Sequence, residues 1–415
     1  MRFMLSIVFV CLSEFASVSC VVERSDIGKT RSTRSWRPVT KATDTHAPLL
    51  PGPSNERTKD LTQHGLKSAD GFSALYNLRS GASNPVDVDP CTTPSGPAHT
   101  ALTLGYFALW YALNVWYNIV NKRVLNAISL PVSLAVAQLG IGSLWVGTQW
   151  AVGVRSRPGK LSADGLRRVV PVSLFHGGGQ LATVLSLGAG AVSFTHVVKA
   201  MEPFFSALVA AIFFGQVFRT PVYISLFPVV AGVSIACFKE VNFSWISFLA
   251  AMVSNLMFAC RSNFSKALMT RPPTEDGASL SSANLYGMVT MAAFVVFLPV
   301  AILMGSRKWV PGWELAMERG YEARILSLEI VLSGISHYLN NEVMYLALGN
   351  VHPTTLAVGN TMKRVFIIVA SLIVFKTPMS RMGVLGSAIA VGGVLVYSLT
   401  KQHYDTLDRK MREKQ

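Results

Sequence analysis

The sequence has few charged residues for its length, and it lacks the short motifs that mark most enzymes. Asp, Glu, Lys and Arg make up 14% of its 415 residues, against about 25% in an average soluble domain. It contains no HExxH, no GxSxG and no acidic cluster with the spacing of metal ligands. The five cysteines are widely spaced and form no CxxC pair, which argues against a zinc site and a disulfide framework. We therefore expect no enzyme, no bound metal and no cofactor.

The charge that is present lies mainly in the most apolar part of the chain. The formal net charge is +15 and the mean hydropathy is +0.40. Residues 101–400 alone hold 21 basic and 10 acidic residues. A basic, hydrophilic body would predict a nucleic-acid partner. A basic, apolar body instead predicts a membrane protein that handles anions, with the lipid bilayer and small anionic solutes as partners and no nucleic acid.

The first hundred residues have the composition of a targeting region. Residues 1–20 carry a short apolar core after Arg2, which is too short to span a bilayer and predicts a signal peptide. Residues 21–98 begin with a basic tract rich in Ser and Thr, typical of a transit peptide, and continue as a polar segment predicted to be disordered. The two signals together indicate a plastid reached through the secretory route, such as an apicoplast. An ordinary secretory protein with a basic tail is the alternative.

Apolar stretches of about 20 residues, the length that crosses a bilayer as a helix, recur throughout 99–400. We predict an all-α polytopic membrane protein with ten transmembrane helices, followed by a basic C-terminal tail over 401–415. The predicted spans are 101–121, 129–153, 169–188, 191–215, 221–239, 242–261, 284–305, 325–349, 352–375 and 380–399.

An internal repeat accounts for this number of spans. A shift of 161 residues places His176 on His337, and it places the segments 185–188 and 231–233 on similar sequences. The halves, about 101–240 and 241–400, would each contain five spans. An odd number of spans requires that the two halves lie inverted in the membrane, as in many secondary transporters with a substrate site near the bilayer midplane.

Three cations lie deep inside two of these spans: Lys199 in the fourth, and Lys363 and Arg364 in the ninth. Each costs about 2.5–3.5 kcal/mol at the centre of a membrane helix, so the chain must compensate them. One explanation is pairing with buried acids, for which the candidates are Glu202, Glu329 and Glu342. The other is an anion site, because a guanidinium and two ammonium groups suit a phosphate dianion.

Uncharged polar residues in neighbouring spans fit the same site. They are His176, Gln180, Thr183, His337, Tyr338, Asn340, Asn341 and Tyr345. The histidines would serve equally as hydrogen-bonded contacts between helices, and the sequence leaves both roles open. The run Gly177-Gly178-Gly179 predicts close helix packing, and Pro203 predicts a kink in the fourth span.

Two segments around the buried cations resemble a known family. AVSFTHVVKAMEPFFSAL (191–208) and AVGNTMKRVFII (357–368) are similar to the signature segments of the plastid triose-phosphate/phosphate translocators, within the drug/metabolite transporter superfamily. The similarity extends over most of 101–400, including YNIVNKRVL (117–125) and NLYGMV (284–289). KAMEPFF is similar to the phosphoenolpyruvate-type branch.

The resemblance implies roles for individual residues. The family's phosphate-binding residues correspond to Lys199, Lys363 and Arg364, and a threonine that contacts the phosphate corresponds to Thr183. Gln180 stands where triose-phosphate members have His, and Asn340 stands where the family has Tyr. Both departures would contact the sugar or acid part of the substrate; in the same region we place His176, His337 and Tyr338 as candidate specificity residues.

The resemblance also implies an activity. We expect an antiporter that exchanges inorganic phosphate for triose phosphates, 3-phosphoglycerate or phosphoenolpyruvate across a plastid envelope, with no obligate protein partner. The main alternative is a nucleotide-sugar antiporter of the Golgi or ER, which has the same ten-helix plan. That alternative fits the signal peptide but accounts less well for the adjacent Lys363 and Arg364.

Overall fold

The computed structural model describes residues 97–238, 240, 243–270, 281–350, 353–377 and 379–412. All of them belong to one compact unit, Ser83–Gln415. The predicted signal peptide over 1–20 and nearly all of the transit-like segment over 21–98 lie outside the described residues. So does the end of the tail, 413–415.

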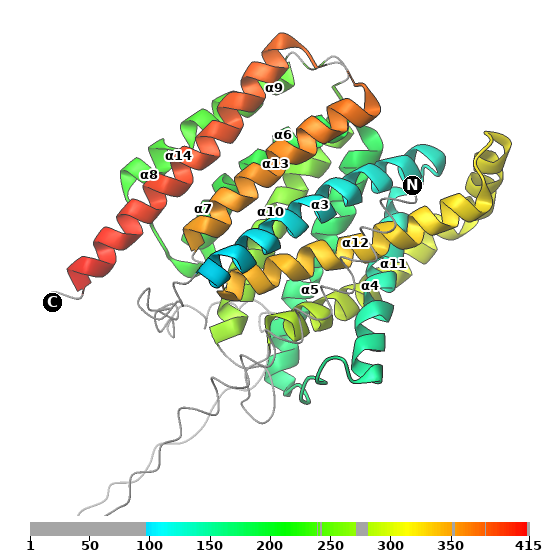
Figure 1. The fold of residues 1–415 in the computed structure, drawn as a ribbon, viewed down its shortest axis with the longest axis horizontal. Coiled ribbons are helices and arrows are strands. Elements are labelled where there is room, and N and C mark those ends of the chain that lie inside the picture. Colours follow the sequence, from blue (N-terminus) through cyan, green and yellow to red (C-terminus); the bar gives the residue numbers. More distant parts are fainter. Residues whose placement is uncertain are drawn as a thin grey trace, which may run out of the picture. The chain divides into compact units, whose positions relative to one another are not determined.

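The described residues are helical and contain no β-strand, which confirms the predicted all-α class (Figure 1). In chain order the helices are α3 (Pro97–Ala127), α4 (Pro131–Val152), α5 (Ala163–Ala189), α6 (Val192–Val198), a 3₁₀ turn (Lys199–Met201), α7 (Glu202–Phe214), α8 (Thr220–Ile224), α9 (Phe227–Phe238), α10 (Trp245–Thr270), α11 (Ser282–Glu318), α12 (Ala323–Asn350), α13 (Pro353–Phe375) and α14 (Arg381–Arg412).

Six helical segments are long and apolar enough to cross a membrane in the part of the chain that is described. They are Pro131–Val152, Val192–Phe214, Thr220–Phe238, Trp245–Lys266, Ser282–Glu318 and Arg381–Met411. Apolar side chains on their outer surfaces are exposed, among them Leu303 and Phe238. Exposed apolar surface on this scale is typical of helices that face lipid.

Several helices run further than their apolar sequences predict, and α11 and α14 are two of them. The spans 284–305 and 325–349 imply a loop over 306–324, and this is wrong for its first part, because α11 continues to Glu318. The reason is a stripe of Trp309, Trp313 and Met317, spaced four residues apart, which packs against the hydrophobic core. The C-terminal tail is likewise helical as far as Arg412, as part of α14.

Small residues bring the helices together at their crossings. α9 packs along α14, and a Cβ atom added to Gly393 of α14 would lie 2.8 Å from the backbone nitrogen of Val229 in α9. The predicted close packing at the triple glycine is confirmed for Gly179, where an added Cβ would lie 2.9 Å from the ring of Phe258 in α10. These glycines allow helix backbones and large rings to approach closely, as in membrane bundles generally.

The fourth predicted span is broken in its middle. α6 ends at Val198, a 3₁₀ turn follows, and α7 begins with Pro203 in its first turn. The break confirms the kink expected at Pro203, because proline is tolerated in the first turn of a helix but not in its interior. The entry into α6 is held by Lys122, whose Nζ donates to the carbonyl oxygens of Leu187 (2.7 Å) and Gly190 (2.9 Å) at the end of α5.

Candidate functional site

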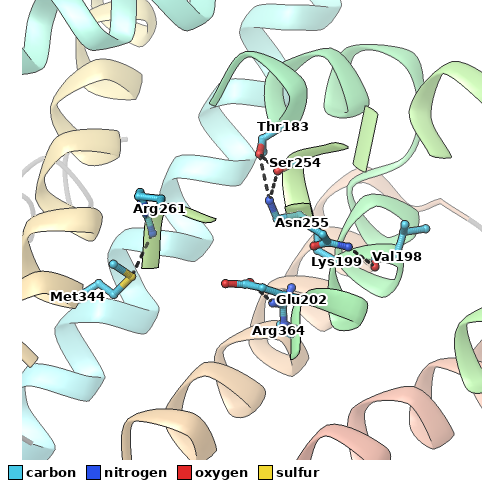
Figure 2. Close-up of polar contacts among 9 residues, drawn as sticks. All are labelled: Thr183, Val198, Lys199, Glu202, Ser254, Asn255, Arg261, Met344 and Arg364. Atoms are coloured by element: carbon cyan, nitrogen blue, oxygen red, sulfur yellow. Dashed lines mark hydrogen bonds and ion pairs between the residues drawn. The ribbon is translucent and has the colours of Figure 1, made fainter. Parts of the chain in front are cut away.

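Lys199 lies at the break between α6 and α7 and points toward helices α5 and α10 (Figure 2). Its Nζ donates hydrogen bonds to Thr183 Oγ1 at 3.0 Å and to Ser254 Oγ at 2.7 Å. The ammonium also lies 4.6 Å from the centre of the Phe258 ring. Two hydroxyls and an aromatic face solvate this buried cation without neutralising it. The predicted pair Lys199 and Thr183 is therefore brought together.

An amide side chain from α10 stabilises the break between α6 and α7 by a hydrogen bond to the backbone. Asn255 Nδ2 donates to the carbonyl oxygen of Val198 at 2.9 Å, as Figure 2 shows. A helix that stops inside the bundle leaves carbonyl groups without intrahelical partners, and Asn255 satisfies one of them. The position of Lys199 thus depends on a side chain of α10.

The adjacent cations of α13 point in different directions, as their sequence positions predict. Arg364 forms an ion pair with Glu202 of α7, with Nη2 2.6 Å from Oε2, as shown in Figure 2. Lys363 Nζ instead lies 4.4 Å from the centre of the Trp110 ring of α3. Pairing with an acid therefore accounts for Arg364, whereas Lys363 rests on an aromatic face.

The other two candidate acids belong to separate ion pairs. Glu329 pairs with Arg123 at 2.8 Å. Glu342 pairs with Arg155, and both of these side chains are almost completely buried. Of the three candidate acids, Glu202 alone contacts one of the predicted cations, Arg364. Internal pairing therefore explains only part of the buried charge.

Arg261 is a further buried cation, and it was not predicted from the sequence. Its guanidinium bonds to Asn341 Oδ1 (3.0 Å) and lies 3.2 Å from His176 Nδ1 and 3.5 Å from Met344 Sδ. It also stacks 4.5 Å from the centre of the Phe258 ring. Arg261 ended the predicted sixth span and so looked like a boundary residue. α10 continues to Thr270, which places this residue inside the bundle.

The two predicted histidines meet at the centre of the bundle. His176 of α5 and His337 of α12 are fully buried, and their rings stack with centres 5.8 Å apart. The ring of Tyr286 packs edge-on against His176 at 5.4 Å. Neither Nε2 atom has a hydrogen-bond partner in the part of the chain described. The pair is a contact between α5 and α12. It also places two nitrogen atoms without hydrogen-bond partners among the described residues near Arg261.

The remaining predicted specificity residues lie around this pair. Gln180 Nε2 donates to Tyr117 OH at 2.9 Å and to Gln138 Oε1 at 2.6 Å. Asn340 Nδ2 donates to the Ser336 carbonyl oxygen of its own helix at 2.9 Å. Tyr338 packs on Tyr286, with ring centres 5.0 Å apart.

The hydroxyl of Tyr338 contacts a different cation, Arg155. It accepts a long hydrogen bond of 3.4 Å from Arg155 Nη1. Tyr338 is therefore tied to the Arg155–Glu342 ion pair more directly than to Lys199.

The site is strongly cationic. The charges of Arg261, Lys363 and Arg364 all repel the Lys199 ammonium, and Glu202 attracts it. The cluster thus brings four cations near one carboxylate, Glu202, which pairs with Arg364. No group of three or more potential metal ligands occurs among the described residues. The arrangement suits a multiply charged anion that accepts hydrogen bonds.

Comparison with known proteins agrees with this chemistry. Residues 101–398 match the Triose-phosphate Transporter family. The chain belongs to that family. The match covers every residue of the cationic cluster described above.

Curated relatives of the chain have three different substrates in their names. Glucose-6-phosphate/phosphate translocator 1 of Arabidopsis thaliana is 40% identical over 71% of this chain and 74% of its own length. Phosphoenolpyruvate/phosphate translocator 2 of the same plant is 34% identical over 86% and 95%. The triose phosphate/phosphate translocator of Spinacia oleracea is 35% identical over 78% and 81%. All three are chloroplast proteins that share phosphate in their names.

Proposed function

We propose that this protein is an antiporter that exchanges inorganic phosphate for phosphorylated three-carbon compounds across a plastid envelope membrane. The compounds are triose phosphates, 3-phosphoglycerate and phosphoenolpyruvate. The observation that carries the proposal is the cluster of Lys199, Arg261, Lys363 and Arg364, in which Glu202 pairs with Arg364 alone among the described residues, in a member of the Triose-phosphate Transporter family. The site performs transport and no catalytic step.

The phosphate group would bind between α5, the break after α6, and α13. Lys199 supplies an ammonium that donates to the hydroxyls of Thr183 and Ser254 and rests on the Phe258 ring, so phosphate oxygens can replace or join the hydroxyls. Arg364 supplies a planar guanidinium that suits two phosphate oxygens at once. To do so it must loosen its contact with Glu202, which acts as an internal counter-ion in the absence of phosphate. Lys363 adds the third charge.

The other end of the substrate would lie toward α10 and α12. Arg261 offers a guanidinium without a carboxylate partner among the described residues, beside the unused nitrogen atoms of His176 and His337. Gln180 and Asn340 are polar side chains of the same region. We assign these residues, with Tyr338 at the periphery, to the substrate moiety that distinguishes one phosphorylated compound from another.

The proposed architecture is ten transmembrane helices arranged as two inverted five-helix repeats. The helix contacts support it, because the most extensive contacts in one half have counterparts in the other half. If α3, α4 and α5 correspond to α10, α11 and α12, the contact of α5 with α10 matches that of α12 with α3. The contact of α4 with α5 likewise matches that of α11 with α12. α4 contacts α11, α6 contacts α13, and α9 contacts α14, so these helices pair with their own counterparts. The stacked residues His176 and His337 are also 161 positions apart, the shift that relates the two halves.

Obligatory exchange follows from the charge of the site. Without phosphate, occluding several uncompensated cations away from water is unfavourable. A bound dianion offsets the repulsion and draws the two halves together, which permits alternating access by rocking of the halves about the site.

A plastid surrounded by more than one membrane, such as an apicoplast, is the proposed location. The signal peptide over 1–20 and the transit-like segment over 21–98 support it, as do the chloroplast locations named for the relatives. The nucleotide-sugar alternative in the Golgi or ER is weaker, because these relatives are phosphate translocators.

The experiment that tests the function is counter-exchange in proteoliposomes loaded with phosphate. External phosphate, dihydroxyacetone phosphate, phosphoenolpyruvate, glucose 6-phosphate and UDP-galactose are offered in turn. We expect exchange with phosphate and with the three-carbon compounds. Exchange of UDP-galactose without exchange of phosphate would contradict the proposal.

A further inference from the structure

The orientation of Gln180 is set by a network of buried side chains that the proposed transport cycle does not otherwise use. Gln138 of α4 lies at its centre and is completely buried. Its amide nitrogen donates to Asn121 Oδ1 at 2.9 Å and also to the hydroxyl of Ser333 on α12. Both of its N–H groups are therefore occupied, and its carbonyl oxygen must face Gln180.

This direction determines which atoms of Gln180 remain for a substrate. Gln180 uses one N–H for Gln138 Oε1 and the other for Tyr117 OH. Reversing its amide would place two carbonyl oxygens against each other. Asn121 closes the network by donating from Nδ2 to Tyr117 OH at 3.3 Å. The carbonyl oxygen of Gln180, an acceptor only, is thus the atom of this amide left without a hydrogen bond in the part of the chain described.

Gln180 lies between the two parts of the proposed site. It is on the same face of α5 as His176, four residues before it, and Thr183, three residues after it. Thr183 contacts Lys199 and His176 contacts Arg261. Over the seven residues from His176 to Thr183 the helix rises about 10 Å, which is close to the length of a small phosphorylated metabolite. A substrate that reaches both ends must therefore pass Gln180.

We propose that Gln138 is a positioning residue that orients Gln180 so that its carbonyl oxygen selects phosphorylated substrates with a free hydroxyl group. This inference rests on the proposed function and names the preferred substrate class. A hydroxyl donates to a carbonyl oxygen, whereas a methyl or methylene group leaves that oxygen unpaired and desolvated. A carboxylate at this position would be repelled. Triose phosphates are then favoured over compounds that carry no hydroxyl, such as phosphoenolpyruvate.

Two pairs of substrates that differ by one hydroxyl group test the proposal in proteoliposomes. Dihydroxyacetone phosphate is compared with hydroxyacetone phosphate, and 2-phosphoglycerate with 2-phospholactate. For the wild-type protein we expect kcat/KM about tenfold higher for the hydroxyl-bearing member of each pair, the effect of one hydrogen bond in a buried site. Equal values for both members would overturn the proposal.

Variants then separate positioning from structural support. Gln138→Met keeps the volume but removes the network, and we expect the tenfold preference to fall to about twofold. Ser333→Ala removes one acceptor of Gln138 and is a milder second variant, with an intermediate ratio. Ser143→Ala is the matched control, because among the described residues this buried hydroxyl of α4 bonds only to the Leu139 carbonyl oxygen of its own helix.

Homoexchange of phosphate distinguishes this inference from the proposed function. Phosphate has no second moiety, so we expect phosphate–phosphate exchange to stay within about twofold of wild type in the Gln138 variant. If the preference is unchanged in the Gln138 and Ser333 variants, Gln138 does not position Gln180. If phosphate homoexchange falls as far as triose-phosphate exchange, its role is structural. Loss of phosphate exchange in the wild-type protein would instead refute the proposed function.

Discussion

Lys363→Ala removes the cation that the structure compensates least. The Lys363 side chain is half-buried on α13 and lies over the Trp110 ring at 4.4 Å. It makes no salt bridge among the described residues, whereas Arg364 beside it pairs with Glu202. Its positive charge is therefore available to the substrate, and we expect the variant to lose affinity for phosphate.

The size of the effect follows from the charges. At an effective dielectric constant of about 20, two unit charges about 5 Å apart attract by roughly 3 kcal/mol, and a dianion by roughly twice that. Desolvation of the ammonium and the phosphate offsets part of this attraction. A net loss of about 3 kcal/mol corresponds to a rise of roughly a hundredfold in KM for phosphate.

Folding should survive the change. Removing the contact with Trp110 costs about 0.5–2 kcal/mol, but the variant no longer buries a cation inside a membrane helix, which costs about 2.5–3.5 kcal/mol. The yield of folded protein and its melting temperature in detergent should therefore stay close to wild type. This separates the effect on binding from an effect on stability.

The assay is phosphate–phosphate exchange in proteoliposomes at several external phosphate concentrations. Lys308→Ala is the matched control, because Lys308 is an exposed lysine of α11, and we expect it to match wild type. A Lys363→Ala variant that folds and exchanges phosphate with wild-type KM and kcat would refute the assignment of Lys363 to the phosphate site.

Two further predictions concern stability. Glu342→Ala leaves Arg155 buried without its partner, and we expect it to destabilise the protein by about 3–5 kcal/mol; an unchanged melting temperature in detergent would show that the ion pair is not structural. Gly393→Leu should prevent the close approach of α9 and α14, whereas Gly392→Leu should be tolerated, because an added Cβ meets nothing within 4 Å at that position; equal yields of folded protein for the two variants would contradict the packing.

The buried cations could be predicted from the sequence because a charge inside an apolar span is costly wherever its helix lies. Lys199, Lys363 and Arg364 were predicted in this way, and the structure places Lys199 beside Thr183 and Arg364 beside Glu202. The break at Pro203 was also predictable, because proline acts locally on its own helix.

Contacts between helices could not be predicted in the same way. Arg261 was missed because α10 runs nine residues past the predicted end of its span, so the charge looked peripheral. Gln138 was missed because an uncharged polar residue in an apolar span has no distinctive sequence signal. Its importance depends on neighbours from α3, α5 and α12 that only the folded chain brings together.

The extension of α11 was missed for a related reason. The segment after Ser306 contains two basic residues and Pro311, which predict a loop. The stripe of Trp309, Trp313 and Met317 packs on the core and offsets these local preferences. Tertiary packing commonly overrides helix propensity in this way.

Uptake of labelled phosphate by proteoliposomes, with and without phosphate inside, tests the central claim most directly. We expect rapid uptake into vesicles loaded with phosphate and almost none into vesicles loaded with an equal concentration of chloride, because the empty cationic site cannot close. Arg364→Ala should abolish the uptake into loaded vesicles. In the proposed cycle the Arg364 guanidinium leaves Glu202 and binds phosphate instead. Equal uptake into both kinds of vesicle, or full activity of the Arg364 variant, would contradict the account.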